Sequence, residues 1–214
     1  QLLPAFAVDR TELLRLLLGR LMRSGRIPTL PVFADSPMAL SVLDVYRAAL
    51  DDDIDFDPGG GLIECRSVDA SKAIADHNGP AILVSASGMA TGGRVLHHLA
   101  RMLPDHRNVV VLSGFQAAGT RGRSLADGAR EVRMHGRDIP VRAAVVQLRS
   151  MSVHADADDL VDWVRRLPER PSEVFVVHGE PAASAALRER LDQELGLLAR
   201  VPTQFDDVAL ATAR

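Results

Sequence analysis

The chain has 214 residues, of which 47% are hydrophobic and 25% are charged, and its formal net charge is −3. This composition excludes a disordered or fibrous protein and leaves room for one large domain or two small ones. The weakly acidic balance excludes a surface that is basic throughout, although a local basic groove is compatible with it. The single cysteine, Cys65, excludes an intramolecular disulfide and favours a reducing, cytoplasmic compartment. No apolar run reaches the roughly 18–20 residues that cross a membrane, so we expect no membrane partner.

Short apolar runs and helical patterns alternate along the chain. The start has neither an initiator Met nor a basic stretch, so we expect a fragment of a longer protein and not a signal peptide. Leucines at helical spacing predict a helix that begins at Asp9 or Thr11, and Asp35 or Ser36 caps a second helix with Pro37 at its first position. This alternation predicts an α/β fold with a parallel sheet. The expected strands are 6–8, 29–34, 81–85, 109–113, 132–135, 142–147 and 174–177, and the expected helices are 11–24, 37–50, 67–77, 94–103, 124–128, 158–166 and 182–195.

An acidic, glycine-rich stretch over residues 51–61 is predicted to be a loop. Its alternating Asp residues raise the alternative of a calcium site. The calcium-loop template needs Gly and Glu at its sixth and twelfth positions, where this chain has Phe56 and Leu62. A solvated loop is therefore the favoured interpretation.

Two further loops combine glycines with polar residues after a predicted strand. Residues 85–94 lead into a helix, whose free N–H groups and dipole suit a phosphate, but they match neither the dinucleotide fingerprint nor the Walker loop. The alternative is a tight turn. In residues 114–123 the side chains of Thr120, Arg121 and Arg123 are candidates to hold phosphate oxygens, and the alternative is an ordinary solvent loop.

Histidines at two predicted strand ends are the candidates for metal or phosphoryl chemistry. His154 and His178 each follow an apolar run and precede a helix, at the edge where open α/β sheets hold ligands. Helix capping by the residues around them is the alternative, and capping alone also explains Asp35. The adjacent pair His97 and His98 points to different helix faces, so we expect one to pack, the other to be exposed, and neither to bind a metal.

Six segments in order resemble one family. The chain is similar to the C-terminal half of an RNA-processing nuclease of the metallo-β-lactamase superfamily, in its β-CASP group, from about Pro4 to about Leu210. The six segments are Pro4-Ala5-Phe6-Ala7-Val8, residues 31–39 (PVFADSPMA), Ser87-Gly88-Met89 with Gly92-Gly93-Arg94, Gly119-Thr120-Arg121-Gly122, Ser152-Val153-His154-Ala155-Asp156 and Val177-His178-Gly179-Glu180.

The resemblance implies a fold, a division into domains and several site residues. It implies a parallel-sheet β-CASP domain over 1–140, with helices on both faces, and over 141–214 the C-terminal strand–helix part of a metallo-β-lactamase αββα sandwich. His154 matches the histidine thought to contact the scissile phosphate, and Asp35 matches the acidic residue thought to orient that histidine. His178 matches a zinc ligand, and a histidine at this position indicates RNA as the substrate in preference to DNA. The implied RNA- or phosphate-binding residues are Ser87, Gly88, Thr91, Gly92, Gly93, Arg94, Thr120 and Arg121.

The implied activity is zinc-dependent hydrolysis of RNA phosphodiester bonds, with two zinc ions in the intact enzyme and a homodimer as the expected assembly. The family's main zinc motif, H-x-H-x-D-H, is absent from these residues. One histidine cannot hold a catalytic zinc, which normally needs three protein ligands. We therefore expect the chain alone to be inactive and to depend on an N-terminal metallo-β-lactamase half. The alternative is a non-catalytic RNA-binding or dimerisation module.

Overall fold

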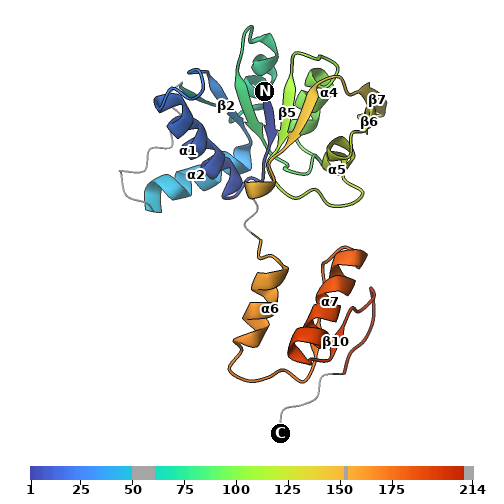
Figure 1. Ribbon diagram of the computed structural model, residues 1–214. Coiled ribbons are helices and arrows are strands. Elements are labelled where there is room, and N and C mark those ends of the chain that lie inside the picture. Colours follow the sequence, from blue (N-terminus) through green and yellow to red (C-terminus); the bar gives the residue numbers. More distant parts are fainter. Residues whose placement is uncertain (50–60, 152–153, 210–214) are drawn as a thin grey trace. The chain divides into compact units, whose positions relative to one another are not determined.

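The computed structural model describes residues 1–49, 61–151 and 154–209 and consists of two compact units (Figure 1). The first unit is Gln1–Ser152 and the second is Val153–Arg214. Residues 51–60 of the predicted acidic loop lie outside the described residues. No helix in the described part is both long and apolar enough to cross a membrane.

The first unit is built on a six-stranded sheet in the order β3-β2-β4-β1-β5-β8. Every neighbouring pair is parallel, with registers such as Phe33↔Leu83 between β2 and β4. Parallel neighbours require crossover connections, and the helical patterns between the predicted strands supply them. The six strands are β1 (Leu2–Pro4), β2 (Val32–Asp35), β3 (Leu62–Glu64), β4 (Ile82–Ser85), β5 (Val109–Leu112) and β8 (Ala144–Gln147).

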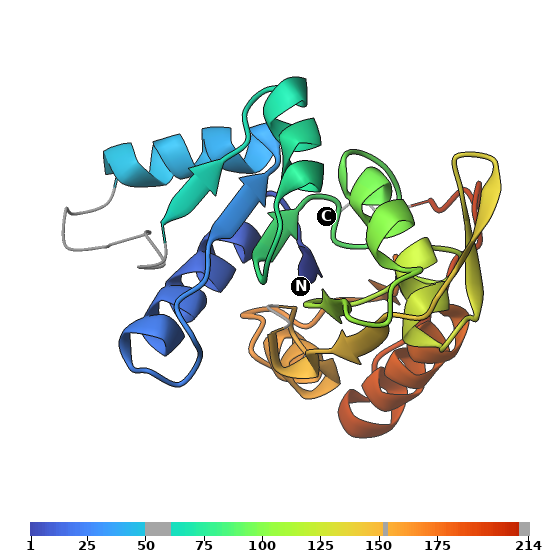
Figure 2. The same ribbon diagram turned by 90° about the horizontal axis from the view of Figure 1, so that it is seen from above.

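Helices cover both faces of this sheet, as can be followed in Figures 1 and 2. Leu3 and Val32 point to one face and pack with Leu14 of α1, whereas Leu2 and Phe33 point to the other. This alternation follows from the two-residue period of a strand, and it gives the sheet a buried core on each side. The predicted α/β fold is thereby confirmed. One face carries α1 (Arg10–Arg23) and α2 (Pro37–Ala49), and the other carries α3 (Val68–Ala73) with its 3-10 extension η1 (Ile74–Asp76), α4 (Val95–Met102) and α5 (Arg121–Ala126).

A β-hairpin that the sequence did not predict follows α5. Its strands, β6 (Glu131–Met134) and β7 (Arg137–Pro140), pair antiparallel with Arg133 opposite Asp138. The two turn residues, His135 and Gly136, have φ of 49° and 75°. Two positive φ values are what a tight two-residue hairpin turn requires. The sequence predicted a single strand here because a histidine at the first turn position is a weak turn signal.

The first compact unit extends past residue 140, where the family resemblance places the boundary between its two domains. Strand β8 pairs with β5 along its whole length, from Val109↔Ala144 to Leu112↔Gln147, and the 3-10 turn η2 (Arg149–Met151) follows it. The backbone groups of β8 are thus satisfied by the first sheet, and the compact units divide after Ser152. Residues 141–151 consequently lie with the first unit in the structure.

The second unit is small and contains two helices and two short parallel strands. Helix α6 begins with a capping box, in which Asp156 accepts from Asp159 N at 2.9 Å and Asp159 accepts from Asp156 N at 3.2 Å. Its apolar face packs Val161 against Leu191 of the second helix. The elements are α6 (Ala157–Arg165), β9 (Val174–Phe175), α7 (Pro181–Leu195) and β10 (Ala199–Arg200).

Candidate functional site

A pocket of about 500 Å³ lies at the carboxyl ends of β1, β2 and β4. Strands β1 and β4 are neighbours, but the chain leaves β1 toward α1 on one face and β4 toward α4 on the other. A parallel sheet opens a crevice at such a reversal, and open α/β folds place their ligands there. Phe6 after β1, Asp35 at the end of β2 and Ser87 after β4 all line the pocket. Topology therefore marks this pocket as the candidate site of the first unit.

The predicted glycine-rich loop forms one wall of the pocket. Ser87, Gly92, Gly93 and Arg94 are all lining residues. Gly93 has φ of 79°, a left-handed conformation that favours glycine. The hydroxyls of Ser87 and Thr91 lie 2.9 Å apart and close the loop on itself. The loop thus brings four of the predicted RNA-binding residues to one place.

The other predicted phosphate-binding residues have structural contacts nearby. Thr120 caps α5, its hydroxyl oxygen accepting from Arg123 N at 3.1 Å. Arg121 donates from Nε to the Arg133 carbonyl at 2.7 Å and from Nη1 to the Thr91 carbonyl at 3.2 Å. Arg121 therefore ties the pocket loop to the β6–β7 hairpin. Neither Thr120 nor Arg121 is among the residues that line the pocket.

Asp35 is a fully buried carboxylate with three side-chain partners. Its Oδ2 accepts from Ser71 Oγ at 2.5 Å and lies 2.6 Å from His98 Nε2, and its Oδ1 accepts from Arg94 Nη1 at 2.7 Å. Burial by itself raises the pKa of Asp35, but the hydrogen bonds from His98, Ser71 and Arg94 outweigh it and hold that pKa below its usual value. The site therefore keeps Asp35 ionised at neutral pH.

The sequence alone favoured Asp35 as a helix cap, but in the structure Asp35 belongs to this buried cluster. Helix α2 is capped instead by Ser36, whose Oγ accepts from Ala39 N at 3.2 Å, and Pro37 occupies the first helical position as predicted. The residue that sequence reasoning missed is His98. The prediction that one residue of the pair His97 and His98 packs and the other is exposed is confirmed, since His98 is 5% exposed. Nothing in the sequence identified Asp35 as the partner of His98.

Arg94 is held by groups on two neighbouring strands. Besides Asp35 at the end of β2, its guanidinium donates to the Cys65 carbonyl at 2.8 Å and to the Arg66 carbonyl at 3.3 Å, both just after β3. Burial raises the pKa of the Cys65 thiol to about 11, so this cysteine stays protonated at neutral pH. Arg94 thus belongs to the wall of the pocket, with its charge directed at Asp35.

The predicted histidines of the second unit are exposed and stand before helices. His154 lies two residues before the capping residue Asp156 of α6, and His178 lies two residues before Glu180, which occupies the N-cap position of α7. His178 has φ of 65°, an uncommon backbone conformation for a residue other than glycine. Within residues 1–49, 61–151 and 154–209, no three His, Cys, Asp or Glu side chains gather as a metal site. His178 therefore has no described group of co-ligands.

Two family models match the chain, and together they define its class. Residues 11–125 match the Beta-Casp domain, and residues 138–202 match the Zn-dependent metallo-hydrolase RNA specificity domain. The chain belongs to the β-CASP family of metallo-β-lactamase proteins, a family of RNA-processing nucleases. The resemblance drawn from the six sequence segments is confirmed.

Similar proteins carry names of RNA enzymes and of a transcription factor. The chain is 36% identical over 202 residues to Ribonuclease TTHA0252 of Thermus thermophilus, covering 89% of this chain and 45% of the relative. It is 32% identical over 211 residues to an RNase J-like protein of Methanocaldococcus jannaschii, covering 95% and 48%. It is 30% identical over 224 residues to the Transcription termination factor FttA of Methanosarcina mazei, covering 97% and 35%. The chain spans less than half the length of these curated relatives.

Proposed function

We propose that the chain is part of a zinc-dependent ribonuclease that hydrolyses RNA phosphodiester bonds. The observation that carries the proposal is the pocket at the switch point of a β-CASP sheet, lined by the loop that the family resemblance assigned to RNA. The match to an RNA specificity domain and the ribonuclease relatives support RNA as the substrate. In this proposal the first unit contacts the RNA strand, and the second unit supplies the histidines.

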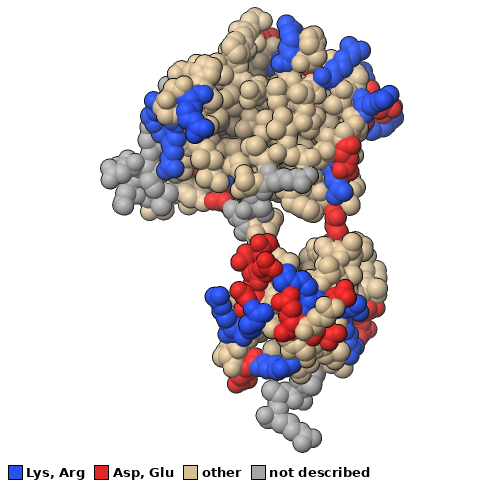
Figure 3. All heavy atoms as spheres, in the orientation of Figure 1, with Lys and Arg blue, Asp and Glu red and all other residues tan. Residues whose placement is uncertain are grey.

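The charge of the two units supports this division. The described residues of the first unit carry 18 Lys and Arg against 11 Asp and Glu, whereas those of the second carry 6 against 12. In Figure 3 several basic side chains stand on the first unit with few acidic neighbours, and acidic and basic groups mix on the second. An RNA backbone is attracted to the basic unit by this charge, in a salt-dependent way.

His154 is the proposed catalytic residue. Its imidazole is exposed at the start of α6. Histidine is the side chain that most often transfers protons in catalysis, and here it would donate a proton to the leaving oxygen. The family resemblance gives Asp35 the task of orienting it. Three side chains contact the buried Asp35, and we further propose that Asp35 is a positioning residue that fixes Arg94 and His98 in the pocket wall.

Zinc is proposed from the resemblance and from the family description. His178 is the residue of this chain that we propose as a ligand, because an exposed imidazole at a strand end is a suitable donor. The described residues do not by themselves fit a zinc site, since they gather no group of three ligand side chains. The remaining ligands would come from elsewhere in the protein, and the chain alone is proposed to be inactive. A homodimer and a cytoplasmic location are further implications of the resemblance and of the single cysteine.

The test is RNA cleavage and zinc content, measured on this chain and on a protein that also contains an N-terminal metallo-β-lactamase half. We expect about two bound zinc ions and cleavage in the longer protein, and neither in the chain alone. A His178→Ala substitution should lower the zinc content of the longer protein, whereas His106→Ala should not, because His106 is a surface residue whose side chain is 84% exposed. RNA binding without zinc or cleavage in either protein would favour the non-catalytic RNA-binding module instead.

A further inference from the structure

We infer that the switch-point pocket binds a nucleobase of the RNA, and that the phosphates lie outside it. The inference rests on the proposed function, because it takes RNA as the ligand, and it names which part of the RNA the site recognises. It differs from the expectation that residues 85–94 form a phosphate cradle. Three features of the pocket carry it: its charge, its apolar walls and its size.

The pocket offers no uncompensated positive charge to a phosphate. Among the described residues that line it, Asp35 and Arg94 are the charged ones, and they pair with each other at 2.7 Å. The Arg94 guanidinium is also bound to the carbonyl oxygens of Cys65 and Arg66. A phosphate placed here would lie beside the buried carboxylate of Asp35, which repels it. An uncharged group meets no such penalty.

The walls suit a flat aromatic group. Phe6, Pro37 and Met38 line the pocket, and the Phe6 side chain is 39% exposed. The Phe6 ring lies over two glycines: a Cβ on Gly88 would be 3.1 Å from its Cδ2, and one on Gly114 would be 3.5 Å from its Cε2. The bare backbone at these positions supports the ring at close range. A ring held in place in this way is a platform on which any of the RNA bases can stack.

The volume of the pocket and its uncharged polar side chains suit a nucleobase. The volume of about 500 Å³ falls within the range of about 300–1,000 Å³ that small-molecule sites occupy, and a nucleoside fits that range. The hydroxyls of Ser36 and Ser87 are the uncharged polar side chains of the lining and can bond to the edge of a base. Gly92 also lines the pocket and carries no side chain that would take up its volume.

The test compares two exposed phenylalanines of the first unit. Binding of a fluorescein-labelled single-stranded RNA of about ten nucleotides is measured with this chain in EDTA, so that metal-dependent cleavage does not interfere. We expect Phe6→Ala to weaken binding by about 5- to 100-fold, the range of one lost base stack, and Phe6→Tyr to retain it. Phe115→Ala is the matched control, because Phe115 is 51% exposed and does not line the pocket, and it should stay within about twofold.

A second arm removes bases from the RNA one at a time. An abasic site at the position that enters the pocket should weaken binding to the wild type but not weaken binding to Phe6→Ala further, since both changes remove the same contact. Should Phe6→Ala fail to fold by circular dichroism, Met38→Ala takes its place, because Met38 is 66% exposed and its loss leaves the core intact. Unchanged affinity of these variants, with RNA bound normally by the wild type, overturns the inference alone. Absence of RNA binding by the wild type contradicts the proposed function as well.

Discussion

Nε2 of His98 lies 2.6 Å from Oδ2 of Asp35, and both side chains are buried. The contact joins the end of β2 to α4, which packs on the sheet face opposite α1. Arg94, just before the same helix, reaches the other oxygen of Asp35. Helix α4 and its N-cap residue Arg94 therefore supply two of the three side chains that stabilise the buried carboxylate. The wall of the pocket depends on this cluster.

Replacing His98 tests the contact directly. We predict that His98→Ala lowers the free energy of unfolding by about 1.5–3 kcal/mol, the range for a hydrogen bond to a charged group. The measurement is urea unfolding followed by circular dichroism. His97→Ala is the neighbouring control: His97 is exposed and stacks on His135 with ring centroids 4.4 Å apart, so its loss should cost less than about 0.5 kcal/mol. Equal effects of the two substitutions would show that the Asp35 contact does not stabilise the fold.

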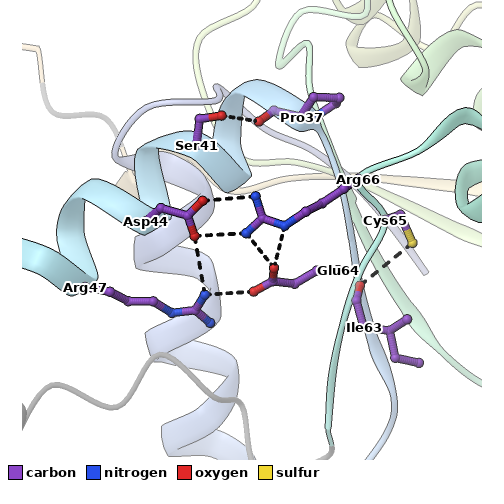
Figure 4. Close-up of polar contacts among 8 residues, drawn as sticks. All are labelled: Pro37, Ser41, Asp44, Arg47, Ile63, Glu64, Cys65 and Arg66. Carbon is purple, nitrogen blue, oxygen red and sulfur yellow. Dashed lines mark hydrogen bonds and ion pairs between the residues drawn. The ribbon is translucent and has the colours of Figure 1, made fainter.

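Removing Asp35 should have a larger effect than removing an exposed aspartate that is also ion-paired. Asp35→Ala leaves Arg94 and His98 without their partner, and breaking a buried pair costs about 3–5 kcal/mol. The exposed aspartate is Asp44, which Figure 4 shows in a network of ion pairs between α2 and the end of β3, formed by Asp44, Arg47, Glu64 and Arg66. The side chain of Asp44 is 50% exposed, so Asp44→Ala should leave the urea midpoint almost unchanged. A similar loss of stability in both variants would contradict the prediction that the buried contacts of Asp35 stabilise the fold more than the exposed contacts of Asp44.

The pH dependence of stability has a definite sign at Asp35. Because the pKa of Asp35 is lower in the folded protein than in the unfolded chain, its contribution is fully present above the unfolded value of about 3.9. The contribution is lost as the pH falls from about 4 through the lower folded pKa. Urea midpoints of the wild type and of Asp35→Asn, measured from pH 6 down to acid unfolding, should converge in that window. A constant difference between them would argue against an ionised Asp35.

Gly92 and Gly93 are adjacent in the pocket loop, and alanine substitutions at the two positions distinguish backbone strain from lack of space. Gly93 has φ of 79°, whereas Gly92 has no left-handed φ and a Cβ on it would meet nothing within 4 Å. We predict that Gly93→Ala lowers the free energy of unfolding by about 1–2 kcal/mol, the cost of a left-handed residue with a side chain. Gly92→Ala should be near neutral. Thermal unfolding checks both, and a destabilising Gly92→Ala would mean that the loop has less room than its geometry shows.

Much of the fold could be predicted because it depends on local pattern. The helix with leucines at helical spacing was expected over 11–24 and is observed as Arg10–Arg23, and Pro37 begins α2 as expected. The position of the pocket loop at the end of a strand was also predicted, from the alternation of apolar and glycine-rich segments. These features need only neighbouring residues, which the sequence displays directly.

What could not be predicted depends on contacts between distant residues. His98 stands 63 positions after Asp35, and only the strand order brings α4 to the end of β2. The same order brings Phe6 and Ser87 to one pocket, and it pairs β8 with β5 in the first sheet. The family resemblance implied that Arg94 and Arg121 bind RNA or phosphate. The structure shows both in contact with protein carbonyls or with Asp35.

The most direct test of the proposed function is RNA cleavage by His154→Ala in a zinc-loaded protein that joins this chain to an N-terminal metallo-β-lactamase half. A labelled single-stranded RNA is the substrate, and His106→Ala is the control for an exposed histidine outside the proposed site. The account predicts that His154→Ala cleaves about 10²- to 10⁴-fold more slowly, as expected when a general acid is lost, while zinc content and folding stay unchanged. Cleavage by His154→Ala within about twofold of the wild type would contradict it.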